Sequence, residues 1–278
     1  MSGERADGEA GISDTKRLVQ MQFGANAANY TVSRVHAKGS SLQRMVDLAA
    51  PQAEWTCLDV ATAAGHTAFA FAPNVAHVVA TDLTPAMLDE ARREAERRGI
   101  ENVSFEIADA EALPFPDARF ACVTCRIAPH HFDRIDAFLS EVARVLAPAG
   151  LLVLVDNLAP DRSTDPSSDE ADLADAARAY NAFEKARDPS HVRALTQSEW
   201  LEAIKRAGFS IEAVEHLDKV MSFDAWCSNM SVGGDQKAAL RQALLAADGA
   251  LARYLTPAAA DGDDVTFRLV ELLVLARR

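Results

Sequence analysis

Two periodicities alternate along the middle of the chain. Apolar runs of strand length lie at residues 55–61, 77–82, 103–108, 120–126 and 151–156. Between these runs the apolar residues fall at helical spacing, most clearly at residues 133–146. Strands that alternate with helices in this way predict a parallel sheet covered by helices on both faces. The pattern therefore predicts an α/β fold.

Local signals mark where several predicted helices begin and end. Thr84 and Pro85 favour a helix start, because threonine caps a first turn and proline is accepted at its first position. Gly99 ends that helix, which covers residues 85–98. Further helices are predicted at residues 15–29, 40–50 and 66–72.

The alternation is interrupted after the fifth strand. A polar loop leads into a helix at residues 170–186, and Thr196 and Glu199 form a capping box before a helix at residues 200–207. The rest of the chain predicts strands at 211–216 and 219–223, one long helix at 235–254 and a final strand at 265–276.

The same pattern predicts a single domain. Residues 1–14 are rich in glycine and acidic residues without periodicity, so we expect a disordered tail. Residues 15–278 are expected to fold together. Within them we distinguish a ligand-binding core at residues 40–160, an inserted helical segment at 161–198 and the remaining sheet and helices at 199–278.

The loop after the first strand carries the strongest chemical signal. The strand ends at Ala61, small residues continue to Gly65, and a helix starts at His66, so a ligand can approach the backbone near helix amides. Asp82 ends the second strand seventeen residues after Gly65. A carboxylate there can accept hydrogen bonds from both hydroxyls of a ribose. We therefore expect an adenosine-containing ligand at the carboxyl ends of the strands.

The composition of the loop favours one such ligand. A dinucleotide requires the full G-x-G-x-x-G spacing for its pyrophosphate, but alanine stands at positions 61, 63 and 64 and only Gly65 remains. S-adenosylmethionine carries no phosphate and demands less of the loop. The sequence therefore favours S-adenosylmethionine as cofactor over NAD.

Five stretches in order resemble the motifs of class I S-adenosylmethionine-dependent methyltransferases, and most resemble the ubiquinone/menaquinone-biosynthesis (UbiE-like) branch. They are Leu58–Ala68, Asp82 with Thr84–Leu88, Asp109–Pro116, Cys125–Phe132 and Glu141–Gly150. The segment Gln22–Tyr30 is similar to the opening helix of that branch. The resemblance implies a Rossmann-like fold: a mostly parallel seven-stranded sheet with an antiparallel C-terminal strand, helices on both faces and a helical lid at residues 161–198.

The resemblance also implies roles for single residues. The methionine part of the cofactor would be held by Asp59 and the backbone of the loop, with Tyr30 closing over it, and the ribose by Asp82 beside Leu83. Asp109 and the amide of Ala110 would meet the adenine, and the carbonyl of Arg126 the amino group. The loop positions are Ala61, Thr62, Ala63 and Gly65.

The chain departs from the family at the position of Ala63, and also at that of Ala61, where the family has glycine. If Ala63 adopts a positive φ angle, its Cβ costs about 1 kcal/mol. We expect this strain to reduce the affinity for the cofactor.

Three histidines are candidate general bases for an acceptor that must lose a proton. His130 and His131 follow the fourth strand at the active-site edge, and His191 lies in the inserted segment. The alternative for each is a structural role, in which the ring packs or caps a neighbouring element.

Composition narrows the choice of partners. The chain has 28 basic and 41 acidic residues, a net charge of −13, and no basic stripe. We therefore expect no stable binding to nucleic acid or to anionic membrane surfaces. The four cysteines have no second pair to complete a metal site, so we expect no metal. The N-terminus is polar and acidic, so we expect no signal sequence there.

These features predict a cytoplasmic methyltransferase that acts on a carbon or oxygen atom of a small apolar or aromatic molecule. A homodimer is compatible with the sequence. Two alternatives stay open at this point: a non-catalytic protein that binds S-adenosylmethionine and acts through partners, and an NAD-dependent oxidoreductase.

Overall fold

The computed structural model describes residues 13–32, 40–259 and 264–278, with side chains in the first helix described as far as residue 24. Most of the expected tail lies outside these residues, and Asp14 is already the first residue of helix α1 (Asp14–Val32). Among the described residues no helix is long and apolar enough to cross a membrane.

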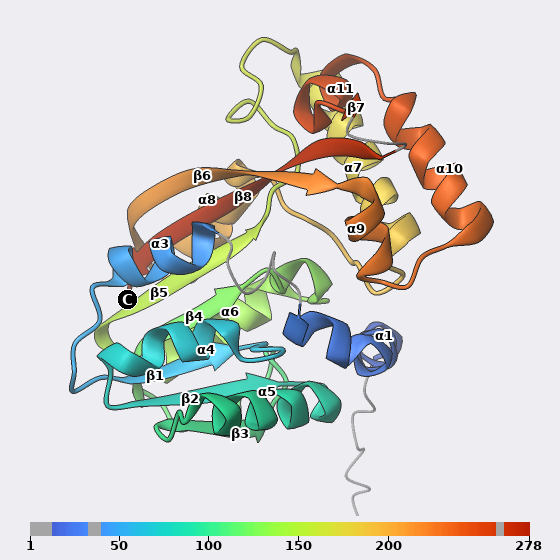
Figure 1. The fold of residues 1–278 in the computed structure, drawn as a ribbon. Coiled ribbons are helices and arrows are strands. Elements are labelled where there is room, and N and C mark those ends of the chain that lie inside the picture. The colour runs from blue at the N-terminus through green and yellow to red at the C-terminus, as the bar shows by residue number, and fades with distance from the viewer. Residues whose placement is uncertain (1–12, 33–39, 260–263) are drawn as a thin grey trace, which may run out of the picture.

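One twisted sheet forms the centre of the molecule (Figure 1). Its strand order is β3-β2-β1-β4-β5-β8-β6. Strands β1 to β5 run parallel, whereas β8 is antiparallel to both β5 and β6, which confirms the predicted Rossmann-like methyltransferase sheet. The strands are β1 (Thr56–Val60), β2 (His77–Asp82), β3 (Val103–Ile107), β4 (Phe120–Arg126), β5 (Leu146–Asn157), β6 (Ser210–Ser222) and β8 (Val265–Arg277). A two-residue strand, β7 (Ala258–Ala259), pairs with β8.

Helices cover both faces of the sheet because the strands are apolar on both sides (Figure 1). On one face, Met45 and Phe71 pack with Cys57 and Val153. On the other, residues such as Phe138 pack with the neighbouring positions of the same strands. The first face carries α3 (Ser40–Ala49), α4 (His66–Phe71) and α5 (Pro85–Arg98), and the second carries α6 (Ile135–Val145) and α8 (Gln197–Arg206).

A group of helices gathers beyond the end of β6 and the start of β8 (Figure 1). It comprises α7 (Glu170–Arg187), α9 (Phe223–Ser228), α10 (Gly234–Leu245) and α11 (Gly249–Leu255). Leu173 and Ala176 of α7 pack against Ala250 of α11. Helix α7 falls within residues 161–198, and the role of that segment as an inserted lid stays a prediction.

Two of the predicted elements are wrong in detail. The single helix expected at residues 235–254 is two helices, because Gly249 adopts a φ of +52° and Asp248 is extended, which starts α11 in a new direction. The two short strands expected at residues 211–216 and 219–223 are one strand, β6, which pairs with β8 over its whole length.

Candidate active site

A cavity opens at the carboxyl ends of the parallel strands. It encloses about 1460 Å³ when its open mouth is included. Its walls come from the loops after β1, β2, β3 and β4, from α1 and from the segment between β6 and α10. The sequence-predicted residues that line it are Ala61, Thr62, Ala63, Asp82, Leu83, Asp109, Ala110, Arg126, His130 and His131.

The loop after β1 is held in an alternating backbone conformation. Ala61 and Ala63 have φ angles of +54° and +48°, and Gly65 has +87°. The positive φ of Ala63 considered from the sequence is therefore present, and Ala61 shares it. At Gly65 a Cβ would lie 2.5 Å from the ring of Phe69, so glycine is required there while alanine is tolerated at a cost at the other two positions.

Asp59 supports this loop from beneath. Its carboxylate is buried and accepts hydrogen bonds from the hydroxyls of Thr62 (2.6 Å) and Thr124 (2.7 Å) and from the amide of Ala68 (3.2 Å). Burial raises the pKa of Asp59 to about 6, although the two hydroxyls oppose the rise. Asp59 is not among the residues that line the cavity. Its hydrogen bonds therefore hold the loop after β1 in place, and its carboxylate does not face the cavity.

Asp82 ties the loop to the end of β2. One carboxylate oxygen accepts from the amide of Ala63 (2.9 Å) and the other from the amide of Thr84 (2.8 Å). Burial raises the pKa of Asp82, and these amide contacts oppose the rise. A carboxylate can accept more than two hydrogen bonds, so Asp82 retains acceptor capacity toward the cavity that it lines.

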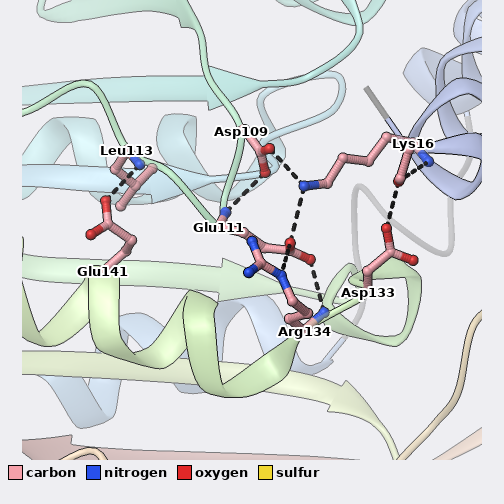
Figure 2. Close-up of polar contacts among 8 residues, drawn as sticks. Lys16, Asp109, Glu111, Leu113, Asp133, Arg134 and Glu141 are labelled. Carbon is pink, nitrogen blue, oxygen red and sulfur yellow. Dashed lines mark hydrogen bonds and ion pairs between the residues drawn. The ribbon is translucent and has the colours of Figure 1, made fainter. Parts of the chain in front are cut away.

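Helix α1 is fastened to the cavity edge by Lys16 (Figure 2). The Lys16 ammonium contacts Asp109 at 2.7 Å and Glu111 at 3.0 Å. The buried Glu111 carboxylate also accepts from the backbone and side chain of Arg134. A second contact joins Gln20 to the carbonyl of Leu83 at 3.0 Å. Asp109, expected to meet adenine, therefore already holds a cation from the N-terminal helix.

The three candidate histidines lie together but in different environments. His130 lines the cavity, and its Nδ1 lies 2.6 Å from the carboxylate of Asp156 at the end of β5. Burial alone would lower the pKa of His130, but the charge and hydrogen bond of Asp156 outweigh it and raise that pKa. His130 is thus an imidazole at the cavity wall with a buried carboxylate behind it.

His131 and His191 make their hydrogen bonds to neutral groups, and the carboxylate of Asp188 lies 4.0 Å from Nε2 of His131. His131 lines the cavity, donates from Nδ1 to the carbonyl of Ser190 (3.0 Å), and packs edge-on against Phe23 of α1. Burial and the charge of His130 lower the pKa of His131 to about 3. His191 does not line the cavity; its Nε2 lies 2.8 Å from the side-chain oxygen of Asn181, and burial lowers its pKa to about 2.

Arg126 and Tyr30 complete the predicted set. The Arg126 side chain is largely buried at the cavity wall, and burial lowers its pKa. The side chain of Tyr30 lies outside the described residues. Its expected closure over the cofactor stays a prediction.

Several functional candidates were not found from the sequence. Lys16 gave no signal, because its partners lie more than ninety residues away along the chain. Asp156 did offer one, since it ends the fifth strand predicted from the sequence, as Asp82 ends the second. The far end of the cavity, which no motif marks, is lined by Asn157, Arg187, Lys219, Met221, Trp226, Asn229 and Leu269.

The residues along the cavity fit an adenosine-bearing cofactor. Residues 61–64 of the loop after β1 line the cavity, whereas Gly65 does not and is required by its close contact with Phe69. Asp82 and Asp109 follow at the ends of the next two strands in the sheet order. A carboxylate between a small-residue loop and a second carboxylate supplies acceptors of the kind that the ribose and adenine of such a ligand need.

Comparisons with known proteins agree with this geometry. The family model described as "Methyltransferase domain" matches residues 57–150. The uncharacterized methyltransferase YcgJ of Bacillus subtilis is 34% identical over 253 residues, which cover 91% of this chain and 96% of YcgJ. The crystal structure of YcgJ covers 86% of this chain and 97% of its own, with a TM-score of 0.77 and 32% identity.

Two further relatives extend the comparison. The crystal structure of a methyltransferase-family protein from Bacillus halodurans is 40% identical, covers 86% of this chain and 99% of its own, and gives a TM-score of 0.76. The demethylmenaquinone methyltransferase of Thermus thermophilus is 43% identical over 141 residues, which cover 48% of this chain and 63% of that enzyme. Neither the oxidoreductase nor the non-catalytic alternative gains support from these relatives.

Proposed function

Because this chain belongs to the class I S-adenosylmethionine-dependent methyltransferases, in the UbiE-like branch, we propose that it methylates a carbon or oxygen atom of a small apolar or aromatic molecule. The cofactor is S-adenosylmethionine. The observation that carries the proposal is one cavity that joins the loop after β1 and Asp82 to His130 and to a far end where Met221, Trp226 and Leu269 lie among polar and charged side chains.

We assign the parts of the cofactor to residues that line the cavity or lie next to it. The backbone of Ala61 to Gly65 would hold the methionine part, and Asp82 the ribose hydroxyls. Asp109 and the amide of Ala110 would meet the adenine. Asp59 would act indirectly, because its hydrogen bonds to Thr62 and Ala68 keep the loop in the conformation that the cofactor meets.

The bound cofactor supplies an electrophilic methyl group on a sulfonium. The protein contributes alignment of the acceptor and exclusion of water. Helix α1 helps to close the cavity, since Lys16, Val19 and Phe23 all line it.

His130 is the best placed of the three histidines to act as general base. It lines the cavity and its pKa is raised, so its neutral form is a stronger base than an unperturbed imidazole. The lowered pKa of His131 makes that ring a poor proton acceptor. His191 lies behind the wall and bonds Asn181, so we assign it a structural role.

The far end of the cavity suits an acceptor with a substantial apolar surface. Met221, Trp226 and Leu269 contribute apolar area there. Thus the acceptor would lie against these side chains, with its reacting atom turned toward His130. The nucleic-acid exclusion, the homodimer and the cytoplasmic location expected from the sequence remain predictions.

A panel of acceptors tests the proposal. The protein is incubated with S-adenosylmethionine and catechol, 4-hydroxybenzoate, a naphthoquinol or an alkylamine, and release of S-adenosylhomocysteine is followed together with the mass of the product. We expect methylation of at least one phenol or quinol and none of the amine. Methylation of the amine alone would contradict the proposed acceptor class.

The variant His130→Gln extends the test to the base. We expect its rate with the phenolic acceptor to fall about 100-fold, the usual contribution of a general base. His216→Gln is the matched control, because His216 is exposed on β6 and contacts Gln197. An unchanged rate in the His130 variant would remove it from the mechanism.

A further inference from the structure

A buried carboxylate stands directly behind His130. Strand β5 runs through five apolar residues, Leu151–Val155, and continues into Asp156, its last residue but one, whose side chain is fully buried. An isolated charge in such a position is strongly destabilising. Oδ1 of Asp156 lies 2.6 Å from Nδ1 of His130, whereas Oδ2 has no hydrogen-bond partner among the described residues. Burial raises the pKa of Asp156, and the charge and hydrogen bond of His130 oppose the rise.

We propose that Asp156 is the positioning residue of His130, and this inference rests on the proposed function. Asp156 accepts the hydrogen bond of Nδ1–H, so the neutral ring has its proton on Nδ1 and its lone pair on Nε2. Because Nδ1 is turned to Asp156, Nε2 is the ring nitrogen left for a ligand in the cavity that His130 lines. The same carboxylate stabilises the imidazolium once Nε2 has taken a proton.

The charged and titratable groups packed around His130 do not offer a competing partner for Nδ1. His131 and His191 lie with ring centroids 4.2 Å and 5.4 Å from His130, and both have lowered pKa values that keep them neutral. The remaining groups that act on the histidine cluster by charge are Glu184, Asp188, Arg187 and Lys185. Asp156 alone among them makes a hydrogen bond to the His130 ring.

The pair formed by His130 and Asp156 indicates a narrower class of acceptor. A carboxylate-supported imidazole is useful when the acceptor must lose a proton as it is methylated, as a phenolic or enolic hydroxyl does. Nε2 takes the proton, and the electron pair of the broken O–H bond forms the new bond to the methyl carbon. The electron pair of the methyl–sulfur bond stays on the departing thioether, and the proton later leaves His130 for solvent. We therefore infer an acceptor with an acidic hydroxyl group, or with a carbon activated by one.

The test is the tautomer and titration of His130, which need no acceptor. Long-range ¹H–¹⁵N spectra of the imidazoles are recorded on the ¹⁵N-labelled protein with S-adenosylhomocysteine across a pH series. His130 is assigned by the signal lost in His130→Gln. We expect neutral His130 to carry its proton on Nδ1 and to titrate above the ordinary histidine value of about 6.5. Asp156→Asn should lower that pKa by about one unit or more, which is a tenfold change in the protonation equilibrium.

A matched control separates this effect from general damage. Asp165→Asn makes the same change at a carboxylate that contacts Ser167, Ser168 and Arg253 and does not line the cavity, so His130 should titrate as in the wild type. Protonation of neutral wild-type His130 on Nε2 overturns the inference, even if Asp156→Asn does not fold. A pKa of His130 that Asp156→Asn leaves unchanged also overturns it.

Calorimetric titration of the wild type with S-adenosylhomocysteine separates a failure of the role proposed for Asp156 from a failure of the proposed function. Binding together with the Nε2 tautomer would reject the role of Asp156 and leave the proposed function standing. Absence of binding would reject the proposed function, whereas the tautomer of His130 would still report on its contact with Asp156.

Discussion

At the scale of single residues, the cofactor loop combines a required glycine with two strained alanines. Gly65 has no space for a Cβ, whereas Ala61 and Ala63 carry one at positive φ. The sequence has alanine where the family has glycine. In the structure these alanines are strained, because the backbone keeps the left-handed conformation that glycine adopts freely. The amide of Ala63 donates to Asp82, and this contact helps to hold it there.

Ala63→Gly should therefore stabilise the protein by about 1 kcal/mol, because it removes the Cβ from a left-handed residue. For a domain of this size the midpoint of thermal unfolding should rise by about 2–4 °C. Ala64→Gly is the matched control, since Ala64 is buried and outside the positive-φ set, and it should destabilise the protein instead. A lower melting temperature for Ala63→Gly would show that the strain is not where the backbone angles indicate.

Asp82→Ala should weaken cofactor binding while the fold persists. The variant loses the proposed acceptor of the ribose hydroxyls and the acceptor of the Ala63 amide, so we expect an affinity at least ~30-fold lower, or about 2 kcal/mol. The thermal shift produced by S-adenosylhomocysteine measures this loss. Asp89→Ala is the control, because Asp89 is exposed and pairs with Arg92; its thermal shift with S-adenosylhomocysteine should equal that of the wild type. An equal shift in a folded Asp82→Ala protein would refute the ribose assignment.

The pH dependence of the rate follows from His130. Asp156 raises the pKa of His130, and a general base acts only when neutral, so activity should be lost below that pKa and rise with pH through it. The midpoint should lie above the ordinary histidine value of about 6.5. Rates with the phenolic acceptor from pH 5 to 9 would show the rise. A rate that is flat over this range would argue against a base of this kind.

At the scale of elements, helix α1 is held to the cavity by few but specific contacts. Lys16 bridges Asp109 and Glu111, and Gln20 reaches the carbonyl of Leu83 (Figure 2 shows the Lys16 contacts). Ser13 adds a hydrogen bond to Asp133. Release of these contacts would open the side of the cavity that Val19 and Phe23 line.

Lys16→Met should loosen α1 without disturbing the sheet. The variant leaves the buried Glu111 carboxylate with Arg134 as its remaining cation, so we expect amides of residues 16–24 to exchange about tenfold faster. Hydrogen exchange with mass spectrometry would follow α1 and β1–β4 separately. Arg17→Met is the control, because Arg17 is exposed and pairs with Asp14 inside the helix. Exchange unchanged from the wild type would show that Lys16 does not fasten the helix.

Most elements could be predicted from the sequence because their signals are local. The capping box at Thr196 and Glu199 is present as predicted, and α5 begins at Pro85 as predicted. The predicted cap by Thr84 is wrong in detail, because its side chain makes no hydrogen bond to the first turn. The break at Gly249 was missed, because glycine inside an alanine- and leucine-rich stretch is a weak signal for a helix end. The partners of Lys16 and His130 depend on contacts across the fold, which periodicity does not reveal.

At the scale of the whole molecule, the parallel order of β1 to β4 is what brings the separate motifs together. The loop after β1, Asp82, Asp109 and His130 are separated along the chain and meet at one sheet edge (Figure 1 shows the arrangement of the strands). The order of motifs therefore predicted most of the residues that line the cavity at this edge. The rest of the lining could not be predicted, because α7, α9 and β6 contribute to it from a segment without recognisable motifs.

The central claim is that this cavity binds S-adenosylmethionine rather than a dinucleotide. Calorimetric titration of the purified protein with S-adenosylmethionine, S-adenosylhomocysteine and NAD in parallel tests it most directly. The account predicts micromolar binding of the first two with one site per chain, and no heat of binding with NAD. Binding of NAD, or of none of the three, would contradict it.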